Sequence, residues 1–200
     1  MKRNLIFIVT IAFSMVLISC GNTKNGHEYV DLGLPSGTLW ATCNVGANSP
    51  EDFGDYFAWG ETITKETYNA STYKYSDNPK TLPESADVAT VNWGIGWRMP
   101  TMEDMMELHK NCTHEWTTQN GVNGMLFTGA NGNEVFFPSA GARGNSNLFG
   151  VGETGGYWSS SLYAEESDNA YFLCFYLDTS SGVSHINRGF GQTIRPICSK

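Results

Sequence analysis

The sequence predicts an α+β domain built from antiparallel strands, one or two helices and long loops. Charged residues make up only 16% of the 200-residue chain, whereas 22 residues are glycine and aromatic residues reach 13%. This composition favours turns and half-buried strands over amphipathic helices. Apolar segments bounded by glycine and asparagine recur along the chain, and a single segment has a strong helix start.

The N-terminus predicts export and lipid anchoring. Basic residues precede an apolar run over residues 5–18, and Ser19 is followed by Cys20. Charged, apolar and small-residue regions in this order are typical of a signal peptide. A cysteine directly after the small residue resembles the lipobox of bacterial lipoproteins, in which the thiol is acylated. The alternatives are an ordinary signal peptide with a chance cysteine, or a membrane helix, which requires a longer run of about 20 apolar residues.

We therefore expect residues 1–19 to be a lipoprotein signal peptide, residues 20–26 a polar tether and residues 27–200 one domain. The formal net charge of the chain is −8 at pH 7, and the signal peptide contains basic residues but no acidic ones. The mature domain is thus strongly acidic, which argues against nucleic acid and against charge-driven binding to an anionic membrane. We expect the domain to contact the membrane through the lipid on Cys20.

The first half of the domain predicts one strand, a long loop and two helices. A strand is expected over residues 38–43, after a Pro-Ser-Gly turn. Residues 62–83 are polar with interspersed tyrosines and no steady period, so we expect a long loop held by its own aromatics. Thr101 and Asp104 resemble a capping box that starts a helix ending near Asn111. A weaker helix is expected over residues 85–91.

The second half predicts strands. Residues 125–128 and 134–137 flank an Asn-Gly turn and are expected to form a hairpin. Residues 170–177 are apolar on both faces, as in a central strand. Residues 193–198 are expected to form the last strand, with Pro196 at a position that need not donate a hydrogen bond.

The stretch GGYWSSS at residues 155–161 raises the question of a serine nucleophile. A nucleophile needs a base within hydrogen-bond reach, and His185 is the most suitable of the four histidines. The stretch lacks the glycines of a GxSxG elbow, so serine catalysis is disfavoured. We expect a strand whose serines face solvent or satisfy neighbouring backbone.

Several motifs in order resemble a known family. The chain is similar to the cell-envelope domains of Bacteroidetes and Fibrobacter called the Fibrobacter succinogenes major paralogous domain. The resemblance implies a C-type-lectin-like fold with small twisted antiparallel sheets, related to the formylglycine-generating enzymes, but no defined activity. It also implies a lipoprotein of the cell envelope, expected at the outer membrane. Its motifs are YVDLGLPSGTLWATCNVGA (29–47), DYFAWGET (55–62), NWGIGWRMPT (92–101), YWSSS (157–161) and IRPI (194–197).

Whether the protein faces the periplasm or the exterior stays open. Surface-exposed lipoproteins of that lineage tend to carry acids soon after the acylated cysteine, and residues 21–24 contain none. The sequence leaves the oligomeric state open as well.

Two kinds of metal site are candidates. Formylglycine-generating enzymes use a copper-binding cysteine pair, and Cys174 and Cys198 lie in the corresponding half of the chain, but outside the motif of those enzymes. Sequence leaves open whether the cysteines of the domain form disulfides or are buried thiols: Cys43, Cys112, Cys174 and Cys198. His109 and His114 are five residues apart, a spacing not expected to share one helical face.

Calcium is the second candidate, because many C-type lectins bind sugars through it. The Glu-Pro-Asn, Gln-Pro-Asp and Trp-Asn-Asp patterns of those lectins are absent from the sequence. An acidic cluster is expected to be solvated rather than to hold a structural cation: Glu51, Asp52, Asp55 and Glu61. We predict no cofactor and assign no metal-ligating residues, and whether a structural cation is bound stays open.

The remaining hypothesis is recognition by exposed loops. Amides, aromatic rings and charges in three loops are the residue types that bind sugars or protein loops, although ordinary turn chemistry explains them as well. The sequence thus favours a noncatalytic module that binds an extracellular glycan or protein, over a structural subunit of an envelope or adhesin assembly and a diverged enzyme of the formylglycine-generating type. The candidate residues are Asn145, Asn147, Phe149, Tyr163, Glu165, Glu166, His185, Arg188 and Phe190.

Overall fold

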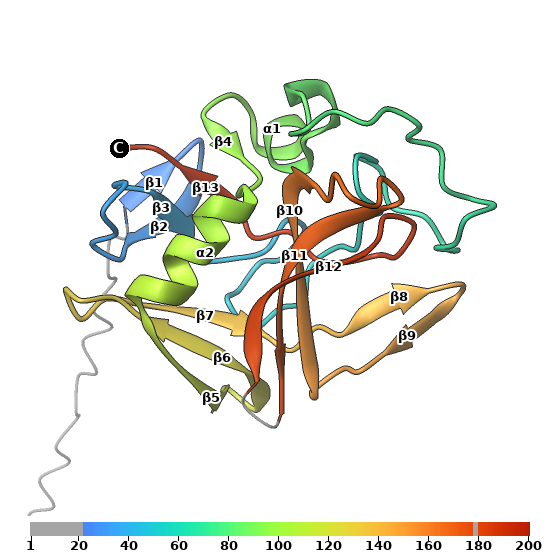
Figure 1. Cartoon of the computed structure of the whole chain (residues 1–200). Coiled ribbons are helices and arrows are strands. Elements are labelled where there is room, and N and C mark those ends of the chain that lie inside the picture. The colour runs from blue at the N-terminus through green and yellow to red at the C-terminus, as the bar shows by residue number, and fades with distance from the viewer. Residues whose placement is uncertain (1–21, 178–179) are drawn as a thin grey trace, which may run out of the picture.

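Four small antiparallel sheets make up most of the fold (Figure 1). The structure is a computed structural model and describes residues 22–177 and 180–200. Strands account for 41% of the residues and two helices for 11%, so the expectation of a small α+β or mostly-β fold is confirmed. The predicted signal peptide and Cys20 lie outside the described residues. Among those described, no helix has the length and hydropathy needed to cross a membrane.

The first sheet joins the two ends of the domain. Its order is β1 (Asn22–Lys24), β2 (His27–Asp31), β3 (Leu39–Ala41), β13 (Ile197–Cys198) and β4 (Trp97–Arg98). Ile197 pairs with Trp40 on one side and with Arg98 on the other. The two ends of the domain thus pair in one sheet, although the last strand contains two residues rather than the six expected.

The predicted tether is shorter than expected. Asn22 pairs with Tyr29, and Lys24 pairs with His27, so β1 and β2 form a hairpin. Asn25 and Gly26 form its turn, both with positive φ angles, of 50° and 82°. Residues 22–26 are thus part of the fold.

Three further sheets carry the rest of the strands. The second contains β5 (Thr113–Gln119), β6 (Val122–Thr128) and β7 (Glu134–Pro138). The third contains β10 (Thr154–Leu162), β11 (Asn169–Tyr176) and β12 (Ser181–Asn187), and the fourth is the hairpin of β8 (Ala142–Gly144) and β9 (Asn147–Phe149). Two predictions are confirmed: β6 and β7 form a hairpin, and β11 is the central strand of its sheet.

The strand β5 was not predicted from the sequence. Its turn to β6 is Asn120-Gly121, with φ angles of 49° and 84°. Two central residues with positive φ suit the right-handed twist of a hairpin, and Asn-Gly is the pair that favours them. The signal was present in the sequence but lay in a segment with no clear alternation of apolar residues.

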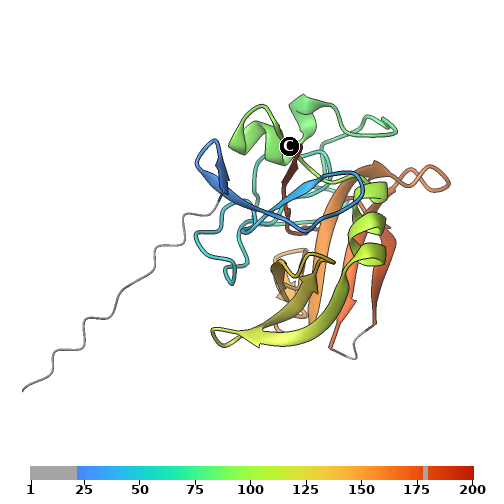
Figure 2. The ribbon, with the colours of Figure 1, turned by 90° about the vertical axis from the view of Figure 1, so that its left-hand side faces the viewer.

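The helices follow the predicted caps. The helix α2 (Met102–Asn111) begins at Thr101 with the expected capping box to Asp104. The weaker helix is divided: a 3₁₀ turn, η1 (Glu84–Ala86), precedes α1 (Val88–Trp93), whose first turn is capped by the Asp87 side chain. Buried side chains of α2 pack with residues of β6 and β11, and Figure 2 shows α2 beside the orange sheet of β10 to β12.

The segment between β3 and η1 is a loop, as predicted. Its tyrosine hydroxyls bind backbone within the same loop: Tyr68 donates to the carbonyl of Tyr56 at 2.5 Å, and Tyr73 donates to that of Trp59 at 2.8 Å. Burial raises the pKa of both tyrosines, so both hydroxyls stay protonated donors at neutral pH. These bonds fix a segment that lacks regular secondary structure.

The GGYWSSS stretch lies in β10 and is buried. A Cβ on Gly155 would overlap the ring of Phe175, and one on Gly156 would overlap the side chain of Gln192. The expectation that serines face solvent is wrong, because Ser159, Ser160 and Ser161 are at most 8% exposed. The expectation that they satisfy backbone is confirmed. Ser159 donates to the carbonyl of Tyr171 at 2.9 Å, and Ser161 accepts the amide of Met102 at 3.0 Å.

The centre of the fold contains a buried arginine without a carboxylate partner among its hydrogen bonds in the described chain. Arg195 is 0% exposed, and its guanidinium lies 4.6 Å from the centre of the Phe137 ring. Its acceptors are Asn44 Oδ1 at 2.8 Å and the carbonyl oxygens of Ala41, Thr42 and Phe136. Arg195 thereby joins the end of β3, the following loop and β7.

We predict that Arg195→Met lowers the free energy of unfolding by about 3 to 5 kcal/mol, because it leaves several buried carbonyl oxygens without a donor. Urea unfolding measures the loss. The matched control is Arg98→Met, which removes an ion pair whose arginine side chain is 46% exposed and is expected to cost under about 1 kcal/mol. Equal losses for the two variants would contradict the central role of Arg195.

Candidate functional site

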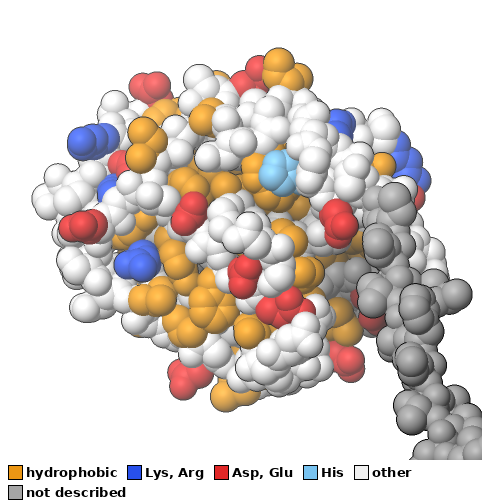
Figure 3. Space-filling model, turned by 180° about the vertical axis from the view of Figure 1, so that it is seen from behind, with side chains coloured by type: hydrophobic (Ala, Val, Ile, Leu, Met, Phe, Trp, Pro, Cys, Tyr) orange, Lys and Arg blue, Asp and Glu red, His pale blue; other side chains and the backbone are white. Residues whose placement is uncertain are grey.

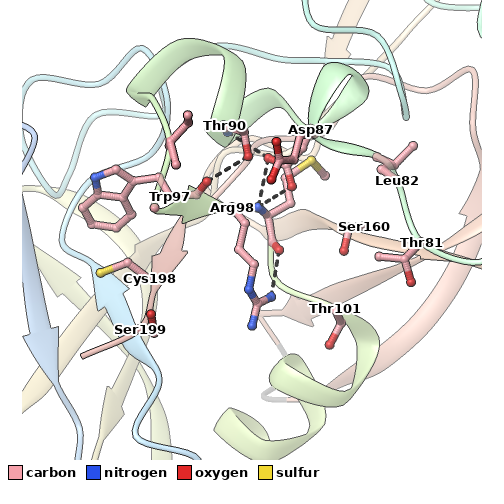
Figure 4. A pocket seen from close by; sticks show the side chains of 14 residues that line it. Thr81, Leu82, Asp87, Thr90, Trp97, Arg98, Thr101, Ser160, Cys198 and Ser199 are labelled. Atoms are coloured by element: carbon pink, nitrogen blue, oxygen red, sulfur yellow. Dashed lines mark hydrogen bonds between the residues drawn. The ribbon is translucent and has the colours of Figure 1, made fainter.

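A cavity of about 360 Å³ lies beside α1, bounded by β4, β10 and β13 (Figure 4). Its polar groups are engaged in holding the fold. Asp87 accepts the amides of Thr90 at 2.9 Å and of Met99 at 2.8 Å. Arg98 donates to Asp104 at 2.6 Å. These bonds hold the local fold, and Ser160, Cys198 and Ser199 also line the cavity.

The four cysteines of the described residues are free thiols. Cys43 is partly exposed, whereas the other three are buried: Cys112, Cys174 and Cys198. Burial raises the pKa of each thiol, which disfavours the thiolate that binds copper or attacks an electrophile. Cys174 and Cys198, weighed as a copper pair, lie in different sheets.

The acidic residues weighed as a cation site act locally. Glu51 accepts from the side-chain amides of Gln119 at 2.6 Å and Asn120 at 2.7 Å. Asp52 accepts the amide of Ser49 at 3.0 Å, and Glu61 pairs with a lysine. Within residues 22–177 and 180–200, no group of three or more His, Cys, Asp or Glu side chains is arranged to hold a metal ion.

A groove of about 660 Å³ runs along α2, where it meets β11 and β12. Met102, Met106, Tyr171 and Val183 supply its apolar lining, and His109 lies within it. From the sequence, the methionines of this helix are expected to belong to the core. That is correct for Met105, which is 0% exposed, but Met106 is 53% exposed. The four-residue spacing of Met102 and Met106 was the available signal.

Two histidines meet beside this groove. His109 and His114 have ring centroids 4.4 Å apart, and His109 Nε2 lies 3.0 Å from Ser181 Oγ. The expectation that they do not share a helical face is correct, since α2 ends before His114, but the chain reverses at Cys112 and brings the rings together. Burial and the neighbouring His114 lower the pKa of His109.

The first cluster of predicted loop residues lies on the β8–β9 hairpin. We call Asn145, Asn147, Phe149 and Phe190 the hairpin patch. The two phenylalanine rings meet edge to face with centroids 6.3 Å apart, and a Cβ on Gly144 would lie about 3 Å from both rings. The backbone of Asn145 exchanges two hydrogen bonds with Tyr68, of 2.8 and 2.7 Å. The hairpin is therefore fixed to the long loop.

The second cluster of predicted residues lies at the opposite end of β11 from its turn to β12. His185 stacks on Tyr163 with centroids 3.8 Å apart and planes 8° from parallel. Tyr163 donates to Glu165 at 2.8 Å, and Glu166 accepts from Asn169 at 2.6 Å. Among the described residues, no hydrogen bond or ring contact joins this cluster to the hairpin patch. The two clusters are therefore treated as separate candidate surfaces.

Arg188 was predicted as an exposed ligand-binding residue, but it is buried. It is 5% exposed, because its guanidinium lies between the rings of Trp59 and Tyr73, at 5.3 and 5.4 Å from their centres. It donates to the carbonyl of Asp77 at 2.9 Å. The sequence places Arg188 in a loop that combines amides, aromatic rings and charge, but its stem and head are buried under the long loop.

Comparison of the chain with models of protein families, with curated proteins and with solved structures gives no match. The resemblance based on the five quoted motifs stays a prediction.

We predict that the protein loses stability as the pH falls below about 6.5, the usual pKa of histidine. Folding lowers the pKa of His109, so protonation favours the unfolded chain. Stability is then complete above that pH and decreases as the pH drops toward the lowered pKa. His109→Gln keeps a polar partner for Ser181 and should flatten this slope.

The measurement is urea unfolding of both proteins between about pH 7.5 and about pH 5. Part of the slope should persist in the variant, because burial also lowers the pKa of His27. An unchanged slope in His109→Gln would show that the histidine pair does not limit acid stability.

Proposed function

We propose that this protein is a lipid-anchored cell-envelope protein whose hairpin patch binds an extracellular glycan or protein without catalysis. The observation that carries the proposal is the pair of phenylalanine rings held beside exposed asparagines. Phe149 is 47% exposed although its backbone belongs to a fixed hairpin. A rigid, partly exposed ring loses little conformational entropy on binding, which makes it suited to be an anchor for a ligand.

The surroundings of the rings support the same proposal. Leu148 and Val151 are also exposed, at 41% and 42%, and Asn145 and Asn147 add amide groups on the same hairpin. In the rear view, hydrophobic side chains are visible across the centre and the lower left of the face (Figure 3). Apolar rings flanked by amides suit the mixed apolar and hydroxyl-bearing faces of a sugar, as well as a protein loop.

The family resemblance supports the setting of this proposal. A C-type-lectin-like fold would present loops from a rigid frame, and small antiparallel sheets with two helices agree with such a fold at a coarser level. The lipobox-like cysteine supports anchoring at the outer membrane, facing either the periplasm or the exterior.

We predict that Phe149→Ser weakens ligand binding by roughly 30-fold, equivalent to about 2 kcal/mol, because it removes the exposed ring of the patch. A glycan array and a pull-down from envelope extracts identify the ligand class, and titration with that ligand measures the change. The matched control is Ile63→Ser, since Ile63 is 77% exposed in another loop.

Equal affinity of wild type and Phe149→Ser for the identified ligand would remove the hairpin patch from the proposal. Recovery of one stoichiometric envelope partner, insensitive to both substitutions, would favour a structural subunit. Stoichiometric uptake of copper or iron would favour the enzyme of the formylglycine-generating type.

A further inference from the structure

An isoleucine is held outward in the turn between α1 and β4. Ile95 is 85% exposed, the largest exposed fraction among the exposed large hydrophobic side chains of the described chain. It lies between Gly94 and Gly96, whose φ angles are 87° and 99°. Residues with side chains rarely adopt these angles, so the turn depends on both glycines. Val91, on the last turn of α1, is 51% exposed.

This turn is attached to the β1–β2 hairpin. The side-chain amide of Asn25 donates to the carbonyls of Trp93 at 3.1 Å and of Ile95 at 3.2 Å. Trp97 Nε1 donates to the carbonyl of Lys24 at 3.0 Å. A Cβ on Gly96 would lie 2.7 Å from Lys24 Cε, so the lysine stem covers the turn. Ile95 and β1 therefore form one rigid unit.

The position of β1 in the chain places this unit next to the proposed anchor. The strand begins at Asn22, and two residues of chain span at most about 7 Å. A lipid on Cys20 would therefore hold β1 close to the bilayer surface. The anchor limits the distance of the domain from the membrane but leaves its orientation free.

We propose that Ile95 inserts into the interfacial region of the bilayer that holds the lipid anchor, and thereby orients the domain. The inference rests on the proposed anchoring at Cys20. An exposed aliphatic side chain beside a lysine matches the lipid interface, where the apolar group enters the acyl boundary and the ammonium stays among the headgroups.

The proposed orientation directs the hairpin patch away from the membrane. Figure 1 places β1 and β2 at the left of the molecule and β8 and β9 at the right. A bilayer in contact with the turn of Ile95 would therefore leave the hairpin patch accessible to a ligand.

The test places one fluorophore in the full chain, purified from membranes and reconstituted into phosphatidylethanolamine and phosphatidylglycerol vesicles. Cys43→Ser removes the partly exposed thiol, and the three other cysteines of the described chain are buried. An NBD label is then attached at Ile95→Cys. The matched control is Ile63→Cys. Its loop is attached to another part of the fold than β1, because the nearby Trp59 donates its backbone amide to the carbonyl of Arg188.

We expect NBD at position 95 to shift to shorter wavelength, brighten on vesicles and be quenched by doxyl-labelled lipid, whereas NBD at position 63 keeps its emission in water. Flotation with the vesicles and water-like emission at both positions would overturn the inference and leave the anchor intact. Failure to float, with labelling of Cys20 in the Cys43→Ser parent, would overturn the anchor and the inference together.

Discussion

The buried guanidinium of Arg195 is the interaction on which the rest of the fold depends. Sheets this small cannot each enclose a core, so they must be joined through their ends and loops. Arg195 does this by donating to carbonyl oxygens at the end of β3, just after it and in β7, while Pro196 beside it accepts the amide of Ala41. Burial lowers the pKa of Arg195, yet guanidinium stays charged in proteins. Its charge is balanced by oriented carbonyl dipoles instead of a carboxylate.

The same demand for internal donors and acceptors decides what the polar residues of the interior do. Ser159 and Ser161 complete backbone bonds, Asp87 caps α1, and Arg188 supports the long loop through Trp59 and Tyr73. Because the sheets are small, many backbone N–H and C=O groups lie outside regular strand pairing. Each such group that is buried needs a hydrogen-bond partner. Residue types that suggest catalysis in the sequence are therefore used to hold loops in place.

Sequence predicted the parts of the fold that depend on near neighbours. The capping box at Thr101 and the hairpin of β6 and β7 are local signals, and both are confirmed. The exposed candidates at 145–149 and 163–166 were found from composition, but their division into two surfaces depends on packing between distant segments. The pairing of His109 with His114 was missed because it arises from a chain reversal. The burial of Arg188 was missed because a distant loop covers it.

Rigidity at the surface distinguishes functional side chains from incidental ones in such a fold. Single exposed hydrophobic residues are common in soluble domains, so exposure alone does not identify a site. Phe149 and Ile95 differ in that each is held by glycine-dependent backbone and by bonds to another segment: Gly144 lies under the Phe149 ring, and Gly94 and Gly96 flank Ile95. An exposed apolar side chain on a fixed backbone keeps one orientation relative to the domain. A domain that binds a ligand on one side and a membrane on the other requires such fixed orientations.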